Sequence, residues 1–275
     1  MYFISGSNDT IKYTFRSKPY DTLQSACMKL FKKPAPEWFA VIPVFLFPVL
    51  WSAEVDTWVY IVPIGLIGFI FYSVHLRDKK RTAAMHAVAK SLKMIFLAGE
   101  FHPSTLGLDG IDLFERGRSS YAVNLIKGTL EDTNVLIFDY HYITGGPKNS
   151  AQYSQTVIAF EICSKDGFKL PQFTCKPERF YHRFADVLGF KDINFEQYPE
   201  FSKAYRLNGD SASSVRKIFN EIVIQQLEAE SKHRWNVDAA GQWLVIHKND
   251  RIIKPDDCPQ FLSDCTTLLN AMTLT

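Results

Sequence analysis

The sequence lacks the cysteine spacings that hold small secreted domains or zinc sites together. It has five cysteines, an odd number, and no two of them form a Cys-x-x-Cys pair. A disulfide framework and a structural metal site are therefore not expected, and free thiols in a reducing compartment are the simpler interpretation. The sequence predicts neither a bound metal nor a cofactor.

The sequence also lacks a basic excess outside one short region. Its net charge is +2, and from Thr82 to the C-terminus 21 basic residues face 23 acidic residues. Positive charge is concentrated in residues 1–37 and 77–81, on either side of the most apolar part of the chain. A nucleic-acid-binding domain needs a basic face to neutralise phosphates, so nucleic acid is not an expected partner.

Catalytic signatures are absent as well. No Gly-x-Ser-x-Gly, His-Glu-x-x-His or dinucleotide fingerprint occurs, and residues 145–148 (Gly-Gly-Pro-Lys) lack the layout of a phosphate loop. Asp139 and His141 could form an acid–base pair on one strand face, and Cys175 with His182 a thiol–base pair. A half-buried polar pair, a core cysteine and a helix-surface histidine are the commoner explanations. The sequence favours a non-enzymatic protein.

Two long apolar runs stand out against these absences. Residues 38–51 carry no charge, and residues 58–76 carry none if His75 is neutral. A spanning helix needs about 20 residues, which the second run supplies. The first run is short and needs local bilayer thinning to span. The alternatives are a buried soluble hairpin, or a re-entrant loop for the first run.

The residues around the two runs predict a membrane hairpin. The connecting loop, residues 52–57, has no Lys or Arg, whereas basic residues lie at both outer ends. By the positive-inside rule both termini face the cytosol at the inner membrane, with the lipid bilayer as a partner. A cleaved signal peptide is not expected, because 37 residues precede the first run. The predicted anchors are Trp38, Trp51, Trp58 and Leu76, and the basic flank is Lys32, Lys33, Arg77, Lys79, Lys80 and Arg81.

The chain divides by pattern into segments, and the last predicts a folded domain. Residues 1–37 form a cytosolic arm, 38–76 the hairpin, 77–99 a stalk helix and 100–275 a cytosolic domain. The stalk prediction rests on apolar residues at helical spacing from Thr82 to Leu97, followed by a glycine.

Strand patterns dominate the first half of that domain. Residues 135–143 alternate, and Pro171 suggests that residues 168–174 form an edge strand. Helices are predicted after Pro177, from Asp210 or Ser211 with Ile222 on the buried face, and from Pro255. The last is predicted to bury a stripe made of Phe261, Leu262, Cys265, Leu268 and Leu269. Antiparallel strands with intervening helices indicate an α+β fold, with a mixed, mainly antiparallel sheet and about three packed helices.

A set of short motifs spans roughly residues 80–262. Taken together they resemble a family of uncharacterised bacterial membrane proteins with a similar N-terminal hairpin. That family often reads Gly-Ser-Gly-Lys after its second strand, where this chain has Gly-Gly-Pro-Lys at residues 145–148. The resemblance implies the topology and a bacterial origin, and no activity. The motifs are Asn124-Leu-Ile-Lys-Gly128, Val135-Leu-Ile-Phe-Asp-Tyr-His-Tyr142, Gln155-Thr-Val157, Leu170-Pro-Gln-Phe173, Lys176-Pro-Glu178, Gly189-Phe-Lys-Asp-Ile193, Tyr198-Pro-Glu-Phe-Ser202 and Lys254-Pro255.

These observations lead to one functional hypothesis and two alternatives. The first is a membrane-anchored cytosolic interaction or scaffold module, with other membrane or cytosolic proteins as partners. The second is a membrane-tethered hydrolase or transferase that uses Asp139, His141, Cys175 or His182. The third is an accessory subunit of a membrane transport complex, in which Gly65 and Gly68 could let another helix approach closely.

Overall fold

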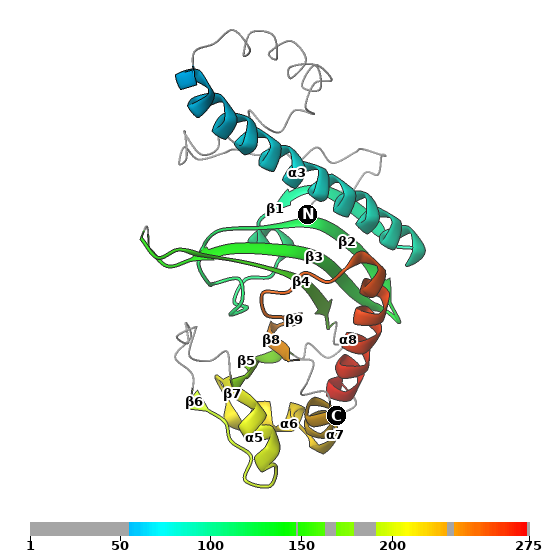
Figure 1. Cartoon of the computed structure of the whole chain (residues 1–275). Coiled ribbons are helices and arrows are strands. Elements are labelled where there is room, and N and C mark those ends of the chain that lie inside the picture. Colours follow the sequence, from blue (N-terminus) through cyan, green and yellow to red (C-terminus); the bar gives the residue numbers. More distant parts are fainter. Residues whose placement is uncertain (1–54, 147, 163–168, 179–190, 230–233, 274–275) are drawn as a thin grey trace, which may run out of the picture. The chain divides into compact units, whose positions relative to one another are not determined.

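The computed structural model describes residues 55–146, 148–162, 169–178, 191–229 and 234–273 (Figure 1). The chain divides into two compact units, Met1–Tyr72 and Ser73–Thr275. The second unit holds the whole of the sheet. Helix α3, Val55–Ser91, contributes residues to both units.

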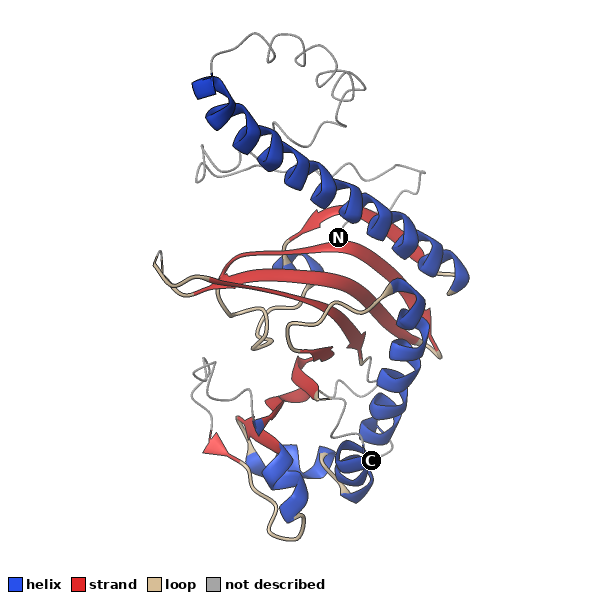
Figure 2. Cartoon of the chain, in the orientation of Figure 1, coloured by secondary structure: helices blue, strands red, loops and turns tan. Residues whose placement is uncertain are grey.

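Within the described residues, the strands form a single nine-stranded sheet in which every pair is antiparallel (Figure 2). The order is β1-β2-β3-β4-β9-β8-β5-β7-β6. This confirms the α+β class, but the sheet, predicted to be mixed and mainly antiparallel, is antiparallel at every described pair. The strands are β1 (Ile95–Phe101), β2 (Arg118–Leu130), β3 (Thr133–Thr144), β4 (Ala151–Glu161), β5 (Leu170–Pro177), β6 (Lys191–Asp192), β7 (Tyr205–Gly209), β8 (Trp235–Gly241) and β9 (Trp243–Lys248).

The helices of this unit fall between and after the strands. The turn η2 (Pro103–Leu106) precedes β2, and α5 (Pro199–Ala204) precedes β7. A pair of short helices, α6 (Ala212–Ile218) and α7 (Glu221–Ala229), joins β7 to β8. The C-terminal element is η4 (Pro255–Asp257) followed by α8 (Cys258–Thr273).

Local sequence accounts for several of these elements. Ser211 caps α6, because its Oγ accepts a hydrogen bond from the backbone N–H of Ser214 at 3.4 Å. Glu131 and Asp132 both have positive φ and form the two-residue turn that joins β2 to β3. The alternation predicted for residues 135–143 is confirmed, because successive side chains of β3 enter cores on opposite faces of the sheet.

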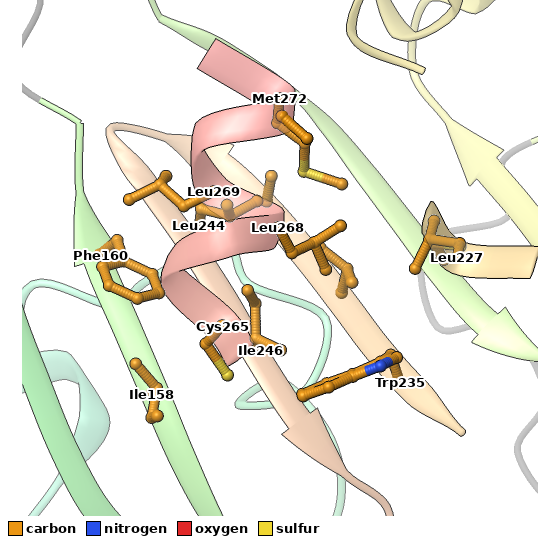
Figure 3. Packing of buried hydrophobic residues seen from close by; sticks show 14 of the residues in the cluster. Ile158, Phe160, Leu227, Trp235, Leu244, Ile246, Cys265, Leu268, Leu269 and Met272 are labelled. Atoms are coloured by element: carbon orange, nitrogen blue, oxygen red, sulfur yellow. The ribbon is translucent and has the colours of Figure 1, made fainter. Parts of the chain in front are cut away.

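The larger core lies on the face of the sheet covered by α8 and by the end of α3. Figure 3 shows Cys265, Leu268, Leu269 and Met272 of α8 over strand residues such as Phe160. From α3, residues 85, 88 and 89 join the same cluster. The buried stripe predicted for the C-terminal helix is therefore confirmed. The principal strand and α7 residues in view are Ile158, Phe160, Leu227, Trp235, Leu244 and Ile246.

A second core lies on the opposite face. Leu136, Phe138 and Tyr140 of β3 pack there with the segment between β1 and β2, residues 102–117. Leu108, Ile111 and Leu113 supply the apolar side chains of that segment. The irregular stretch between β1 and β2 is thus a packed cover for this sheet face.

The predicted stalk helix is too long. Helix α3 ends at Ser91, and Leu97 lies in β1, where it pairs with Leu125 of β2. Lys93 has φ of 57°, a left-handed conformation that stops the helix, and the N–H of Met94 bonds back to the carbonyl of Ala89 at 2.8 Å. The apolar spacing fitted a helix, but strand pairing with β2 prevails.

The prediction of an edge strand at Pro171 is also wrong, because β5 lies between β8 and β7. The ladder between β5 and β8 shifts register between Leu170 and Phe173, and pairing with β7 begins only at Phe173. Proline therefore occupies an irregular part of an interior strand, where its missing N–H interrupts no ladder bond.

Ile222 is 59% exposed, whereas a single helix through residues 211–222 predicts that it is buried. The structure has a break after Ile218, and Asn220 begins a new helix by accepting a bond from the N–H of Val223 at 3.0 Å. Because α6 and α7 are separate helices, the residues of α7 that face the core do not continue the spacing of those in α6, and Ile222 faces outward.

The two apolar runs differ in how far the structure describes them. Among the described residues one helix, Ile61–Ser91 within α3, is long and apolar enough to cross a membrane, and it contains most of the second run. The arm of residues 1–37, the first run with Trp38 and Trp51, and the helix predicted after Pro177 lie outside the described residues.

Candidate functional site

The junction between α3 and the sheet is centred on an ion pair between Arg81 and Asp139. Nε of Arg81 lies 2.7 Å from Oδ2 of Asp139, and Nη2 lies 2.6 Å from Oδ1. The side chain of Asp139 is 1% exposed. Because the guanidinium contacts both oxygens, this two-point contact fixes the rotation of the end of α3 against β3 as well as its position.

The remaining lone pairs of Asp139 are also used. Nδ2 of Asn124 donates to Oδ2 at 2.9 Å, and Oγ1 of Thr156 donates to Oδ1 at 2.9 Å. Thr82, the next residue of α3, donates from Oγ1 to Oδ1 of Asn124 at 2.9 Å. A buried carboxylate with four donors is a satisfied structural group rather than a free base.

The same network includes the segment that leads into α8. Nη1 of Arg81 donates to the carbonyl of Ile253 at 2.9 Å, and the N–H of Ile253 donates to Oγ1 of Thr156 at 2.9 Å. The N–H of Thr156 bonds the carbonyl of Arg251 at 3.1 Å. One guanidinium thus connects α3, the middle of the sheet and the start of the C-terminal helix.

His141 lies beside this network. Its Nδ1 is 2.8 Å from Oγ of Ser154, and its ring stacks on Tyr121 with centroids 5.0 Å apart. Burial lowers the pKa of His141, and Arg81 adds to the effect while Asp139 and Asp78 oppose it. At neutral pH the ring is neutral.

A second polar cluster lies on the opposite face of the sheet. Nζ of Lys176 on β5 is 2.7 Å from Oδ2 of Asp112, and Arg116 pairs with the same oxygen. Burial pushes the pKa of Asp112 up, but the two cations outweigh it and hold that pKa below its usual value. The cluster fastens the cover segment, residues 102–117, to the sheet.

Asp238 and His247 extend this cluster on β8 and β9. Nε2 of His247 is 3.4 Å from Oδ2 of Asp238, and both side chains are fully buried. Burial lowers the pKa of His247, against the opposing effect of Asp238. Nδ1 of His247 and Oδ1 of Asp238 have no hydrogen-bond partner among the described residues.

The structure separates the candidate catalytic residues. Cys175 and Ile137 lie in register on the sheet, four strand spacings apart. The residues that pair between them, from strand to strand, are Val237, Ile246 and Ile158. At about 4.8 Å between neighbouring strands, this register places Cys175 roughly 19 Å from Ile137, beyond reach of the Asp139–His141 pair. Burial raises the pKa of its thiol well above the usual value.

His182 lies outside the described residues. Among the described residues, no group of three His, Cys, Asp or Glu side chains is placed to hold a metal ion.

Comparison with known proteins identifies a fold neighbour. No family model matches the sequence, and no curated protein matches it. The crystal structure of the mycobacterial trehalose monomycolate transport factor A, TtfA, superposes with a TM-score of 0.50 at 10% sequence identity. The match covers 70% of this chain and 96% of that chain. At this identity the likeness shows the fold alone.

The sequence pattern placed Arg81 in a basic flank and did not indicate its buried partner. One signal was available: Arg81 lies four residues before Met85 and seven before Val88, on the stripe of α3 that packs into the core. Asp112 and Arg116, at helical spacing, carried a similar signal. Nothing local in the sequence pairs Asp238 with His247.

A neighbouring stripe of α3 borders an open groove of about 560 Å³. Its helical wall follows one stripe of α3, and Phe96 of β1 forms part of the other wall. The rings of His86 and Phe96 meet edge to face with centroids 5.4 Å apart. The lining residues are His75, Asp78, Lys79, Thr82, Ala83, His86 and Phe96.

Proposed function

We propose that this chain is a membrane-anchored accessory module of a membrane transport system, with its sheet domain at the cytosolic face of a bacterial inner membrane and no catalytic role of its own. The observation that carries the proposal is α3, a single helix that contains both an exposed apolar segment and the Arg81 side of the Arg81–Asp139 junction.

The apolar half of α3 supports the anchor. Its large hydrophobic side chains between residues 62 and 76 are exposed, and Ile64 and Phe69 are among the most exposed. A row of exposed apolar side chains on this scale is costly in water and is the surface that lipid tails accept. A hairpin completed by residues 38–51 stays part of the proposal, as does the cytosolic position of both termini.

The basic residues that follow support the orientation. Arg77, Lys79 and Lys80 are exposed at the end of the apolar segment. Lys and Arg are retained on the cytosolic side of membrane spans. The Arg81–Asp139 ion pair supports a positional role, because it fastens the sheet to the last turns of the helix that carries the anchor.

The transport assignment draws on the fold neighbour, whose name describes a factor in trehalose monomycolate transport. This chain shares that fold, and the proposal gives it an accessory role in transport. The proposal does not extend to the same substrate. The enzyme alternative gains no support from the described residues. The carboxylate of Asp139 already accepts four hydrogen bonds, and Cys175 is buried on a distant strand.

The proposed partner surface is the free edge of β1. This strand ends the sheet order, and no other described strand pairs with its outer side. Ile95 is 65% exposed and Leu97 38% exposed, both on that strand. An extended segment of a membrane transport protein could add to this edge through backbone hydrogen bonds and place apolar side chains against Ile95 and Leu97.

Site-specific photocrosslinking tests this surface in intact cells. A photoreactive amino acid replaces Ile95, and Ile222, a similarly exposed isoleucine on α7, is the matched control. We expect an integral membrane transport protein to be captured from position 95 and not from position 222. Capture of the same proteins from both positions, or of none from position 95, contradicts the proposal.

A further inference from the structure

The groove beside α3 begins where the chain changes from apolar to charged. Six of its lining residues belong to α3, at positions 75, 78, 79, 82, 83 and 86. This spacing places them on one face of the helix. His75 lies inside the apolar run and Asp78 and Lys79 just after it, so in a membrane-inserted helix the groove opens at the headgroup layer.

The groove presents one negative and one positive group side by side. Asp78 and Lys79 are adjacent and exposed, and no described residue forms an ion pair with either. Nε2 of His75 is buried within the groove wall and has no hydrogen-bond partner among the described residues. The exposed Lys79 and Asp78 offer one ammonium group for a phosphate and one carboxylate for a cation.

The rest of the lining is apolar in character. Ala83 and Phe96 contribute carbon surface, and the ring of His86 packs edge-on against Phe96. Thr82 faces inward with its hydroxyl bonded to Asn124. A ligand that fits this surface combines a small zwitterionic end with a larger apolar body, which is the chemistry of a phospholipid.

We propose that the groove binds the headgroup of a phospholipid that carries a primary amine, with its phosphate on Lys79 and its ammonium on Asp78. An anionic glycerol headgroup would leave the carboxylate of Asp78 unmatched beside the phosphate. A trimethylammonium headgroup has no N–H to donate to it. The inference rests on the membrane insertion proposed above and adds a specific lipid to it.

The test uses the full chain, reconstituted in nanodiscs with equal parts phosphatidylethanolamine, phosphatidylglycerol and phosphatidylcholine. Lipids that stay bound after mild detergent extraction are counted by native mass spectrometry. We expect phosphatidylethanolamine to be enriched over both other lipids. Equal retention of the three lipids, or enrichment of phosphatidylglycerol, overturns the inference.

Charge variants locate the binding. Lys79→Gln should lower retained phosphatidylethanolamine roughly threefold to fivefold, which is the change in affinity expected when one partly exposed ion pair is lost. Asp78→Asn should move the preference toward phosphatidylglycerol. Lys80→Gln is the matched control, because Lys80 is exposed on the same helix but does not line the groove. An equal loss in Lys80→Gln means non-specific attraction of lipid and also overturns the inference.

Fractionation separates the two possible failures. If the wild-type chain is absent from membranes, the anchor fails and the lipid site fails with it. If it fractionates with membranes but shows no amine preference, only the lipid site fails. All of the substituted positions are exposed, so thermal unfolding of each variant should match the wild type and exclude a folding defect.

Discussion

Arg81 and Asp139 are 58 positions apart in the chain and meet through two hydrogen bonds of 2.7 and 2.6 Å. Removing the arginine leaves a carboxylate buried in the sheet without its cation. We expect Arg81→Met to lower the free energy of unfolding by about 3 kcal/mol, measured by thermal and denaturant unfolding of the detergent-solubilised chain.

Lys80→Met is the control for that prediction and should change stability by less than about 0.5 kcal/mol, because Lys80 is exposed. The double variant Arg81→Met/Asp139→Leu should recover part of the loss, since the buried charge is gone as well. If Arg81→Met and Lys80→Met unfold alike, the ion pair does not hold α3 to the sheet.

The lowered pKa of His247 predicts how the stability of the fold depends on pH. Burial lowers its folded-state pKa from the ordinary value of 6.5, so the unfolded chain takes up a proton there before the folded chain does. The contribution of neutral His247 to the free energy of unfolding is complete above pH 6.5. It declines as the pH falls from 6.5 toward the lowered pKa that His247 has in the folded state. His141 adds to the same trend, because its pKa is also lowered.

Denaturant unfolding between about pH 7.5 and pH 5 measures this slope. We expect stability to fall with acidification in the wild type and less steeply in His247→Gln, because one of the two histidines with a lowered pKa is then missing. A slope unchanged by His247→Gln and by His141→Gln would assign the acid sensitivity to other groups.

Gly117 and Gly241 give a matched pair of backbone tests. Both have positive φ, 70° and 63°, so alanine at either costs roughly 1–2 kcal/mol of left-handed strain. A Cβ at Gly117 would also lie 2.5 Å from the carbonyl oxygen of Ile143, whereas a Cβ at Gly241 meets nothing within 4 Å. Gly117→Ala should therefore unfold at a clearly lower temperature than Gly241→Ala, and equal transitions would contradict the close approach.

Cys175 should be inert to thiol reagents in the native protein. Its side chain is fully buried and burial raises its pKa, so little thiolate forms and no reagent reaches it. Iodoacetamide labelling followed by peptide mass spectrometry should modify Cys175 only after denaturation. Rapid labelling of Cys175 in the folded protein would instead support the hypothesis of a thiol nucleophile on β5.

Patterns that depend on neighbouring residues were readable from the sequence. The alternation of residues 135–143, the serine cap of α6, the buried stripe of α8 and the apolar half of α3 are all local features, most of them set by a repeat of two or 3.6 residues. A side-chain periodicity is a property of the local backbone, so no knowledge of distant partners is needed to read it.

The tertiary structure decided which segments meet. Strands β9 and β8 enter between β4 and β5, which makes β5 an interior strand despite Pro171, and pairing with β2 turns Leu97 from helix into strand. Assembly of the same sheet brings Arg81 to Asp139 and Asp238 to His247. Such contacts join residues that lie on different elements, and burial of a common core selects them, so no local pattern in this sequence specified them in advance.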